Sequence, residues 1–209
     1  SEQIEFLSDA LQRYSWDEDS GYFGYVAHDE AGLPVGILRH DSGANFNMGL
    51  DGVSPLVAGA CTAEQEETIV GRLMDENRLW TRIGLSTVDR SAPYYTPDGY
   101  WNGAVWLPHQ WFVWKTLLDL GRPEEAHRIA RTGLELWKSE VEESYNCHEH
   151  FIIATGRGAG WHHFSGLSSP ALAWFGAYHR PGRLTVGFDT WVESREFSPD
   201  HTSLRATLR

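Results

Sequence analysis

The chain has 209 residues, enough to bury a sizeable core. Its 29 acidic and 17 basic residues give a formal net charge of −12. This charge argues against a nucleic-acid partner and against an anionic membrane surface, because both favour a basic face. No apolar run approaches the ~18 residues of a membrane-spanning helix.

The cysteine pattern indicates a reducing compartment. Cys61 and Cys147 lie too far apart for a metal-binding spacing or a disulfide framework. We therefore expect a cytoplasmic chain, with a secreted one as the alternative. No signal peptide opens the chain, and its start at Ser1 suggests a processed or trimmed product.

Apolar residues at helical spacing predict a first helix over residues 1–14. Residues 15–52 are rich in glycine and aspartate and are expected to form a long loop with one short hairpin. A second helix opens at Thr62, which makes a capping box with Gln65, and is expected to run to about Trp80. A loop as long as residues 15–52 in a compact domain is usually functional.

A helical hairpin follows a second loop at residues 81–103. Pro108 suits the first turn of its first helix, and Gly121 is a natural stop. Pro123 begins the second helix of the pair. Residues 140–167 then form a third loop, which is rich in glycine.

The last helix is predicted from Ser169, as the N-cap, to about His179. Beyond it, residues 181–209 read as a β tail, with a turn at residues 198–200 and a return strand at residues 202–208.

These elements predict an all-α fold for residues 1–180, a toroid of paired helices with aromatic, glycine-rich loops at one end. A tetratricopeptide-type solenoid is the alternative, because residues 120–126 resemble one of its hairpins, but no 34-residue repeat is present.

Three loops carry residues suited to chemistry. In the first, Trp101 and Trp106 flank Asn102, and His109 follows. The chain has 10 tryptophans, and indole faces suit the apolar patches of sugar rings as well as a protein core. A sugar-stacking wall and a loop packed on its own helix are both consistent with this pattern.

In the second loop, Glu142 and Glu143 precede Tyr145 just beyond a predicted helix end. Carboxylates are disfavoured at the negative end of a helix. They are either solvated loop acids or include a general base tuned by aromatic burial.

The third loop, residues 156–164, combines glycines with Trp161, His162 and His163. Glycines allow the backbone to approach a ligand. A zinc site is the alternative, but the histidines lack the i, i+4 helical spacing of known sites, so we expect no metal and no cofactor.

These loops, in this order, resemble the C-terminal half of glycoside hydrolase family 63 and its trehalase and mannosylglycerate-hydrolase-like relatives. Residues 99–106 are similar to the family's G-Y-W-R-G-P-x-W loop, and residues 143–146 to its E-x-Y-[ND] segment. Weaker similarity covers residues 54–59, 80–86, 155–156 and 160–167.

The resemblance implies an (α/α)6 barrel, present as roughly its C-terminal half, and inverting hydrolysis of an α-glycosidic bond in a small gluco- or manno-configured saccharide. It makes Glu143 the general base and places the general acid, an aspartate, before residue 1. Asp51 or Asp98 is the alternative acid if the fold differs. The family's arginine is Asn102 here and its proline is Ala104, which suggests a different substrate preference.

The loops and the resemblance together predict one catalytic residue, Glu143, and a set of substrate-binding residues: Trp101, Asn102, Trp106, His109, Tyr145, Trp161 and His163. Besides the saccharide, the expected partner is the missing N-terminal half of the barrel or a second copy of the chain, because an open half barrel would expose apolar helix faces.

Two other functions remain open at this point. A sugar isomerase or epimerase on the same barrel would use histidines as acid and base, with His109, His162 and His163 as candidates. A non-catalytic glycan-binding fragment would need only the tryptophan-lined surface.

Overall fold

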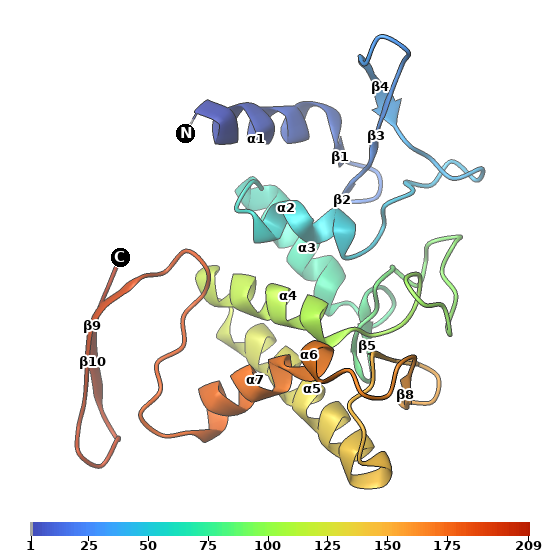
Figure 1. Ribbon diagram of the computed structural model, residues 1–209. Helices are drawn as coiled ribbons and strands as arrows, with labels where there is room; N and C mark the ends of the chain where they lie inside the picture. The colour runs from blue at the N-terminus through green and yellow to red at the C-terminus, as the bar shows by residue number, and fades with distance from the viewer. Residues whose placement is uncertain (1) are drawn as a thin grey trace. The chain divides into compact units, whose positions relative to one another are not determined.

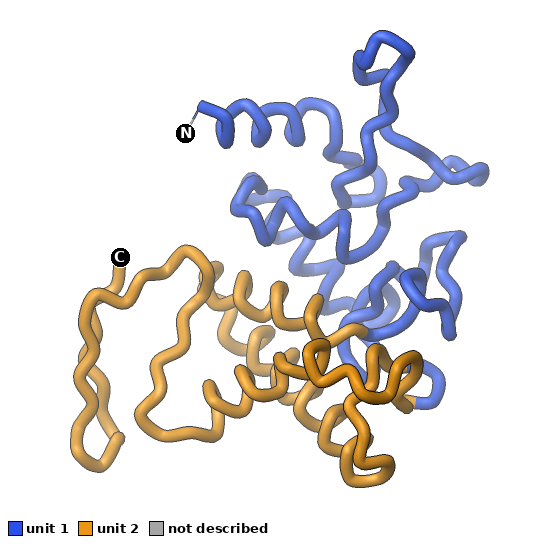
Figure 2. The backbone as a smooth tube through the Cα atoms, viewed as in Figure 1, with its two compact units in different colours: residues 1–105, 152–155 blue, residues 106–151, 156–209 orange. Residues whose placement is uncertain are grey.

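A computed structural model describes residues 2–209. The chain divides into two compact units: residues 1–105 with 152–155 form unit 1, and residues 106–151 with 156–209 form unit 2 (Figure 2).

Unit 1 combines helices with short hairpins (Figure 1). Its helices are α1 (Glu2–Tyr14), the 3-10 turn η1 (Asp51–Val53), α2 (Ser54–Val57) and α3 (Ala63–Met74). Its strands are β1 (Trp16–Asp17), β2 (Tyr22–Phe23), β3 (Val26–His28), β4 (Pro34–Ile37), β5 (Trp80–Thr81) and β6 (Gly84–Leu85). The strands pair in sequence order as three antiparallel hairpins. The long loop after α1 therefore holds two hairpins, where one was expected.

Helix α3 begins as predicted and ends earlier than predicted. Thr62 and Gln65 form both hydrogen bonds of the capping box, which confirms the N-terminus. The helix stops at Met74, because Asp75 adopts an extended conformation, and Trp80 lies in strand β5 instead. The predicted helix thus wrongly included Trp80, which lies six residues beyond the last helical residue.

A buried polar contact lies within the core of unit 1. The carboxylate of Asp89, fully buried, accepts hydrogen bonds from the Tyr22 hydroxyl at 2.9 Å and from Arg78 at 3.2 Å.

The first predicted helix, α1, is present, but its apolar residues Ile4 and Leu7 are largely exposed.

Unit 2 is built on three helices, α4 (Leu107–Asp119), α5 (Pro123–Ser144) and α7 (Pro170–His179). The predicted hairpin and last helix are therefore confirmed, including the prolines in their first turns and the left-handed Gly121 between α4 and α5. The remaining elements of unit 2 are α6 (Ser165–Ser168), β7 (His150–Phe151), β8 (Gly158–Ala159), β9 (Val192–Phe197) and β10 (Leu204–Leu208).

Close packing joins the three helices of unit 2. Gly133 of α5 lies against the buried indole of Trp174 on α7, where an added Cβ would come within 2.4 Å of the ring. Trp114 of α4 is also buried and donates from its indole nitrogen to the Tyr178 hydroxyl at 3.0 Å. The first contact packs α5, the helix that carries the candidate base, against α7, and the second joins α4 to α7.

The tail forms the predicted turn and return strand. Strands β9 and β10 pair antiparallel, with Leu204 opposite Phe197. The segment before them is not a strand. Instead, Asp119 at the end of α4 accepts hydrogen bonds from the backbone N–H groups of Phe188 and Asp189 and from the Thr190 hydroxyl.

The all-α prediction is only partly right. Helices dominate, but the described residues also form ten short strands in five two-stranded antiparallel sheets. The reason is that the glycine-rich loops turn back on themselves, as at Gly21 and Gly84, both of which have positive φ. Within residues 2–209, no helix has the length and apolar character needed to cross a membrane.

Candidate functional site

The C-terminal end of α5 carries the predicted base. The helix continues through Ser144, so Glu143 lies in its last turn and not in the loop that was predicted to start at residue 140. Tyr145 ends the helix in a left-handed conformation (φ 57°), and its N–H bonds to the carbonyl of Val141. Residues 140–144 contain neither glycine nor proline, so nothing in their sequence stops the helix sooner.

Arg157 joins two carboxylates on this helix. Its Nε and Nη2 atoms donate to the two oxygens of Glu140 at 2.9 and 3.1 Å, and its Nη1 donates to Oε1 of Glu143 at 2.5 Å. Glu140 and Glu143 are three residues apart and so share one helix face. A single guanidinium therefore pairs with two neighbouring acids.

The two acids differ in their surroundings. Glu140 is 3% exposed and also accepts a hydrogen bond from the N–H of Gly158 at 2.8 Å. Hydrogen bonds from Arg157 lower the pKa of Glu140 to about 2, against the opposing effect of burial. The Glu143 side chain is 62% exposed, so solvent water reaches its carboxylate.

The position of Arg157 depends on the hairpin formed by β7 and β8. In this hairpin His150 pairs with Ala159 and Phe151 with Gly158. An added Cβ on Gly158 would come within 2.3 Å of the His148 ring, so the close approach requires glycine. The His148 Nε2 in turn lies 3.4 Å from Glu140.

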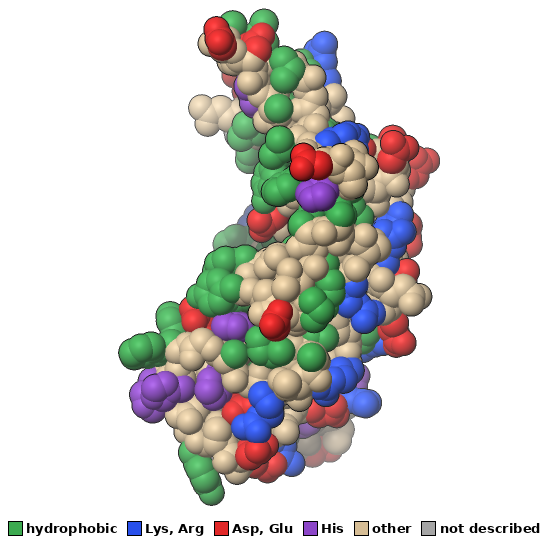
Figure 3. All heavy atoms as spheres, turned by 90° about the vertical axis from the view of Figure 1, so that its right-hand side faces the viewer, with side chains coloured by type: hydrophobic (Ala, Val, Ile, Leu, Met, Phe, Trp, Pro, Cys, Tyr) green, Lys and Arg blue, Asp and Glu red, His purple; other side chains and the backbone are tan. Residues whose placement is uncertain are grey.

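Trp161 and His163 lie in the loop that follows β8. Trp161 is 62% exposed and stacks on His162, whose ring lies 4.2 Å from that of His163. On the face drawn in Figure 3, histidine side chains gather beside exposed hydrophobic ones. Among residues 2–209, no group of three or more His, Cys, Asp or Glu side chains is placed to hold a metal ion.

Trp106 and His109 lie at the start of α4. Trp106 is 2% exposed and stacks on His150, with ring centroids 5.1 Å apart. Burial lowers the pKa of His150, which favours its neutral ring. His109 is half-buried in the first turn of the helix. Trp106 thus contributes its indole to the core of unit 2, while Tyr145, which directly follows α5, is almost fully exposed.

Trp101 and Asn102 belong to unit 1. Trp101 is exposed and makes an edge-to-face contact with Tyr100. The amide nitrogen of Asn102 donates to the carbonyl of Tyr94 at 3.0 Å and to the Thr96 hydroxyl at 3.1 Å. The Asn102 amide therefore stabilises its own loop.

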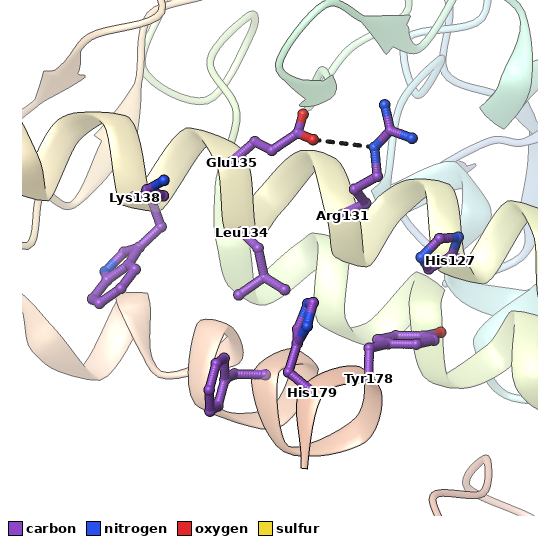
Figure 4. Close-up of a pocket in the computed structure, with 9 residues that line it drawn as sticks. His127, Arg131, Leu134, Glu135, Lys138, Tyr178 and His179 are labelled. Carbon is purple, nitrogen blue, oxygen red and sulfur yellow. Dashed lines mark hydrogen bonds and ion pairs between the residues drawn. The ribbon is translucent and has the colours of Figure 1, made fainter. Parts of the chain in front are cut away.

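A pocket of about 550 Å³ opens between α5 and α7 of unit 2 (Figure 4). Its wall includes Trp137, Phe175 and Tyr178, and the exposed ion pair Arg131–Glu135 lies on the α5 side. None of the predicted site residues lines this pocket.

Two residues of the site were not identified from the sequence. Glu140 is the buried anchor of Arg157, and Arg157 contacts the predicted base. A helix extended to Ser144 would have placed Glu140 and Glu143 on one face. Arg157 follows 17 residues after Glu140, and its pairing depends on how the intervening loop folds.

Comparison with known proteins matches residues 1–165 to the family model described as the mannosylglycerate hydrolase MGH1-like glycoside hydrolase domain. The chain is 30% identical to the mannosylglycerate hydrolase of Thermus thermophilus over 163 residues, which are 76% of this chain and 34% of that protein. It is 32% identical to a mannosylglycerate hydrolase of Selaginella moellendorffii over 126 residues, 59% of this chain and 24% of the relative.

Solved structures give a consistent result. A glycoside hydrolase family 63 mannosylglycerate hydrolase from Thermus thermophilus, in complex with glucose, is similar with a TM-score of 0.58 at 27% identity, covering 80% of this chain and 36% of that one. The neutral trehalase of Saccharomyces cerevisiae shares the fold, with a TM-score of 0.60 at 19% identity over 83% of this chain and 29% of that one. The chain spans about a third of the length of the Thermus relative.

Proposed function

Because the chain belongs to the mannosylglycerate hydrolase MGH1-like glycoside hydrolase family, we propose that the protein carrying it hydrolyses an α-glycosidic bond in a small gluco- or manno-configured saccharide. We further propose that its helices form part of an (α/α)6 barrel, with α4 and α5 as one helical hairpin. The exposed apolar residues of α1 support a partner there, either the remaining part of the barrel or a second copy of the chain.

The observation that carries the proposal is the position of Glu143. Its carboxylate projects from the last turn of α5, accepts one hydrogen bond from Arg157, and stays accessible to water. A carboxylate with these contacts is suited to accept a proton from a water molecule.

In the proposed reaction the bond changes occur on opposite faces of the sugar. Glu143 removes a proton from water as the water oxygen bonds to the anomeric carbon. The bond from that carbon to the leaving oxygen breaks, and an acid outside this chain protonates the leaving oxygen. Such pairs of carboxyl groups stand ~6.5–9.5 Å apart, which leaves room for the water.

The names of the relatives make mannosylglycerate the first substrate to test, followed by trehalose. The family's usual arginine is Asn102 here, and its amide is held by Tyr94 and Thr96. We therefore expect a substrate preference that does not depend on a forked cation at position 102.

The test compares Glu143→Gln with Glu142→Gln in the protein that carries this chain. Glu142 is a matched control, because its side chain is similarly exposed and forms an ion pair with Lys138 at 3.6 Å. Loss of the general base should lower kcat by roughly 10²–10⁴-fold. Glu142→Gln should leave kcat within about twofold. Equal turnover of both variants and the wild type would remove Glu143 from the mechanism.

The stereochemistry is tested by proton NMR of the first product. An α-glycoside should release the β-anomer before mutarotation, and initial release of the α-anomer would contradict inversion.

A histidine-dependent sugar epimerase is the second candidate, favoured by the adjacent, exposed rings of His162 and His163. Conversion of a sugar without release of a reducing end would support it. Binding with neither reaction would indicate a glycan-binding role.

A further inference from the structure

The contacts of Arg157 connect the candidate base to the buried Glu140 of unit 2. Glu143 is an exposed glutamate with three rotatable side-chain bonds, and such a side chain samples several rotamers unless something holds it. The single guanidinium nitrogen that reaches Glu143 is 2.5 Å from its Oε1. What holds Arg157 therefore determines how well Glu143 is held.

Arg157 is held by a forked pair. Two of its nitrogens bind the two oxygens of Glu140, a geometry that fixes the plane of the guanidinium as well as its distance. Glu140 is itself immobilised by burial and by the N–H of Gly158. The third nitrogen, Nη1, then points at Glu143 from a fixed plane.

The loop backbone supports the same arrangement. Gly156 has a φ of 73°, and Gly158 lies against the His148 ring with no room for a Cβ. The two glycines flank Arg157 and bring the loop close to α5. The register of β7 and β8 fixes the loop along the helix.

We propose that Arg157 is a positioning residue, which orients the carboxylate of Glu143 toward the attacking water, and that Glu140 anchors Arg157 for this purpose. The proposal rests on the proposed function, because it gives Arg157 a role only if Glu143 is the base. Arg157 is not expected to contact the reacting atoms.

The experiment measures kcat and KM for Arg157→Gln and Arg157→Lys in the protein that carries this chain. Arg131→Gln is the control, because Arg131 makes an exposed ion pair with Glu135 on α5, the helix that carries Glu143, but far from position 143 in sequence. Arg157→Gln should lower kcat about 10- to 100-fold with KM changed less than about threefold, since orientation affects the transition state more than binding. Arg157→Lys should restore part of kcat, because one ammonium cannot bind both acids in a fork.

A double-mutant cycle separates positioning from a merely structural role. In the Glu143→Gln background, Arg157→Gln should cause no further loss of residual turnover beyond about twofold, because the effect is transmitted through Glu143. Multiplying losses would overturn the proposal. So would a wild-type kcat in Arg157→Gln, or a fall in kcat that matches the fraction of unfolded protein measured by circular dichroism.

The outcomes also distinguish an error in the role of Glu143 as base from an error in the role of Arg157 as positioning residue. If Glu143→Gln keeps wild-type turnover, the proposed base is wrong, whatever Arg157 does. If Glu143→Gln is inactive while Arg157→Gln behaves like Arg131→Gln, only the positioning role is wrong.

Discussion

Replacing Glu140 by glutamine should destabilise the protein in a pH-dependent way. The pKa of Glu140 falls from an ordinary value of 4.5 to about 2, mainly through hydrogen bonds from Arg157. A carboxyl whose pKa is lower in the folded chain stabilises the fold above the unfolded pKa. This contribution is present above about pH 4.5 and is lost as the pH falls through about 2.

The pKa of Glu140 and the exposure of Arg157 give the size of the expected loss in the free energy of unfolding. A pKa difference of about 2.5 corresponds to ~3.4 kcal/mol, at 1.36 kcal/mol for each pKa unit. The Arg157 side chain is 46% exposed, so water screens the pair, and we expect roughly 2–3 kcal/mol at neutral pH. Proton linkage removes more than half of this contribution by about pH 3.

Urea unfolding of the wild type and Glu140→Gln, at neutral pH and at about pH 3, measures both values. Glu142→Gln is the control and should change the free energy of unfolding by no more than about 0.5 kcal/mol. A deficit in Glu140→Gln that stays constant across this range, or lies within the range of the control, would refute the reasoning.

Three further predictions concern stability. Tyr145→Gly should raise the free energy of unfolding by about 0.5–1 kcal/mol, because a bulky residue in a left-handed conformation is strained and its exposed ring packs on little; an unchanged urea midpoint would contradict this. Gly133→Ala should destabilise by roughly 1–3 kcal/mol through its clash with a buried indole, whereas Gly71→Ala, in an open position on α3, should stabilise by about 0.5–1 kcal/mol; equal urea midpoints would refute the packing argument. Asp119→Ala should release residues 186–190, seen as faster amide hydrogen exchange there and unchanged exchange in α5.

Helix positions could be predicted because local signals determine them. The capping box at Thr62 and the prolines in the first turns of α4, α5 and α7 lie within a few residues of the boundaries they set. The end of α5 could not be predicted in this way. It is made by Tyr145, a residue that seldom adopts a left-handed conformation.

The candidate site was only partly predictable, because some of its contacts join residues that are distant in sequence. Glu143 is recognisable from a four-residue motif, but the contact between Glu140 and Arg157 joins segments whose approach depends on the packing of Gly158 against His148. Trp106 shows the converse limit. Composition and spacing do not distinguish an indole that stacks on His150 in the core from one that faces a ligand, so its predicted role in binding stays a prediction.

The bridge from Glu140 to Arg157 also closes a ring of chain. The segment between these residues is tied at both ends, so inserting or deleting even one residue there would move the guanidinium off its two acids. The turn between β9 and β10 is also closed by hydrogen bonds, as from the Ser198 N–H to the Ser203 carbonyl, but no residue of the candidate site depends on its length. Among homologous sequences, the number of residues separating positions 140 and 157 should therefore vary less than the number separating 197 and 204.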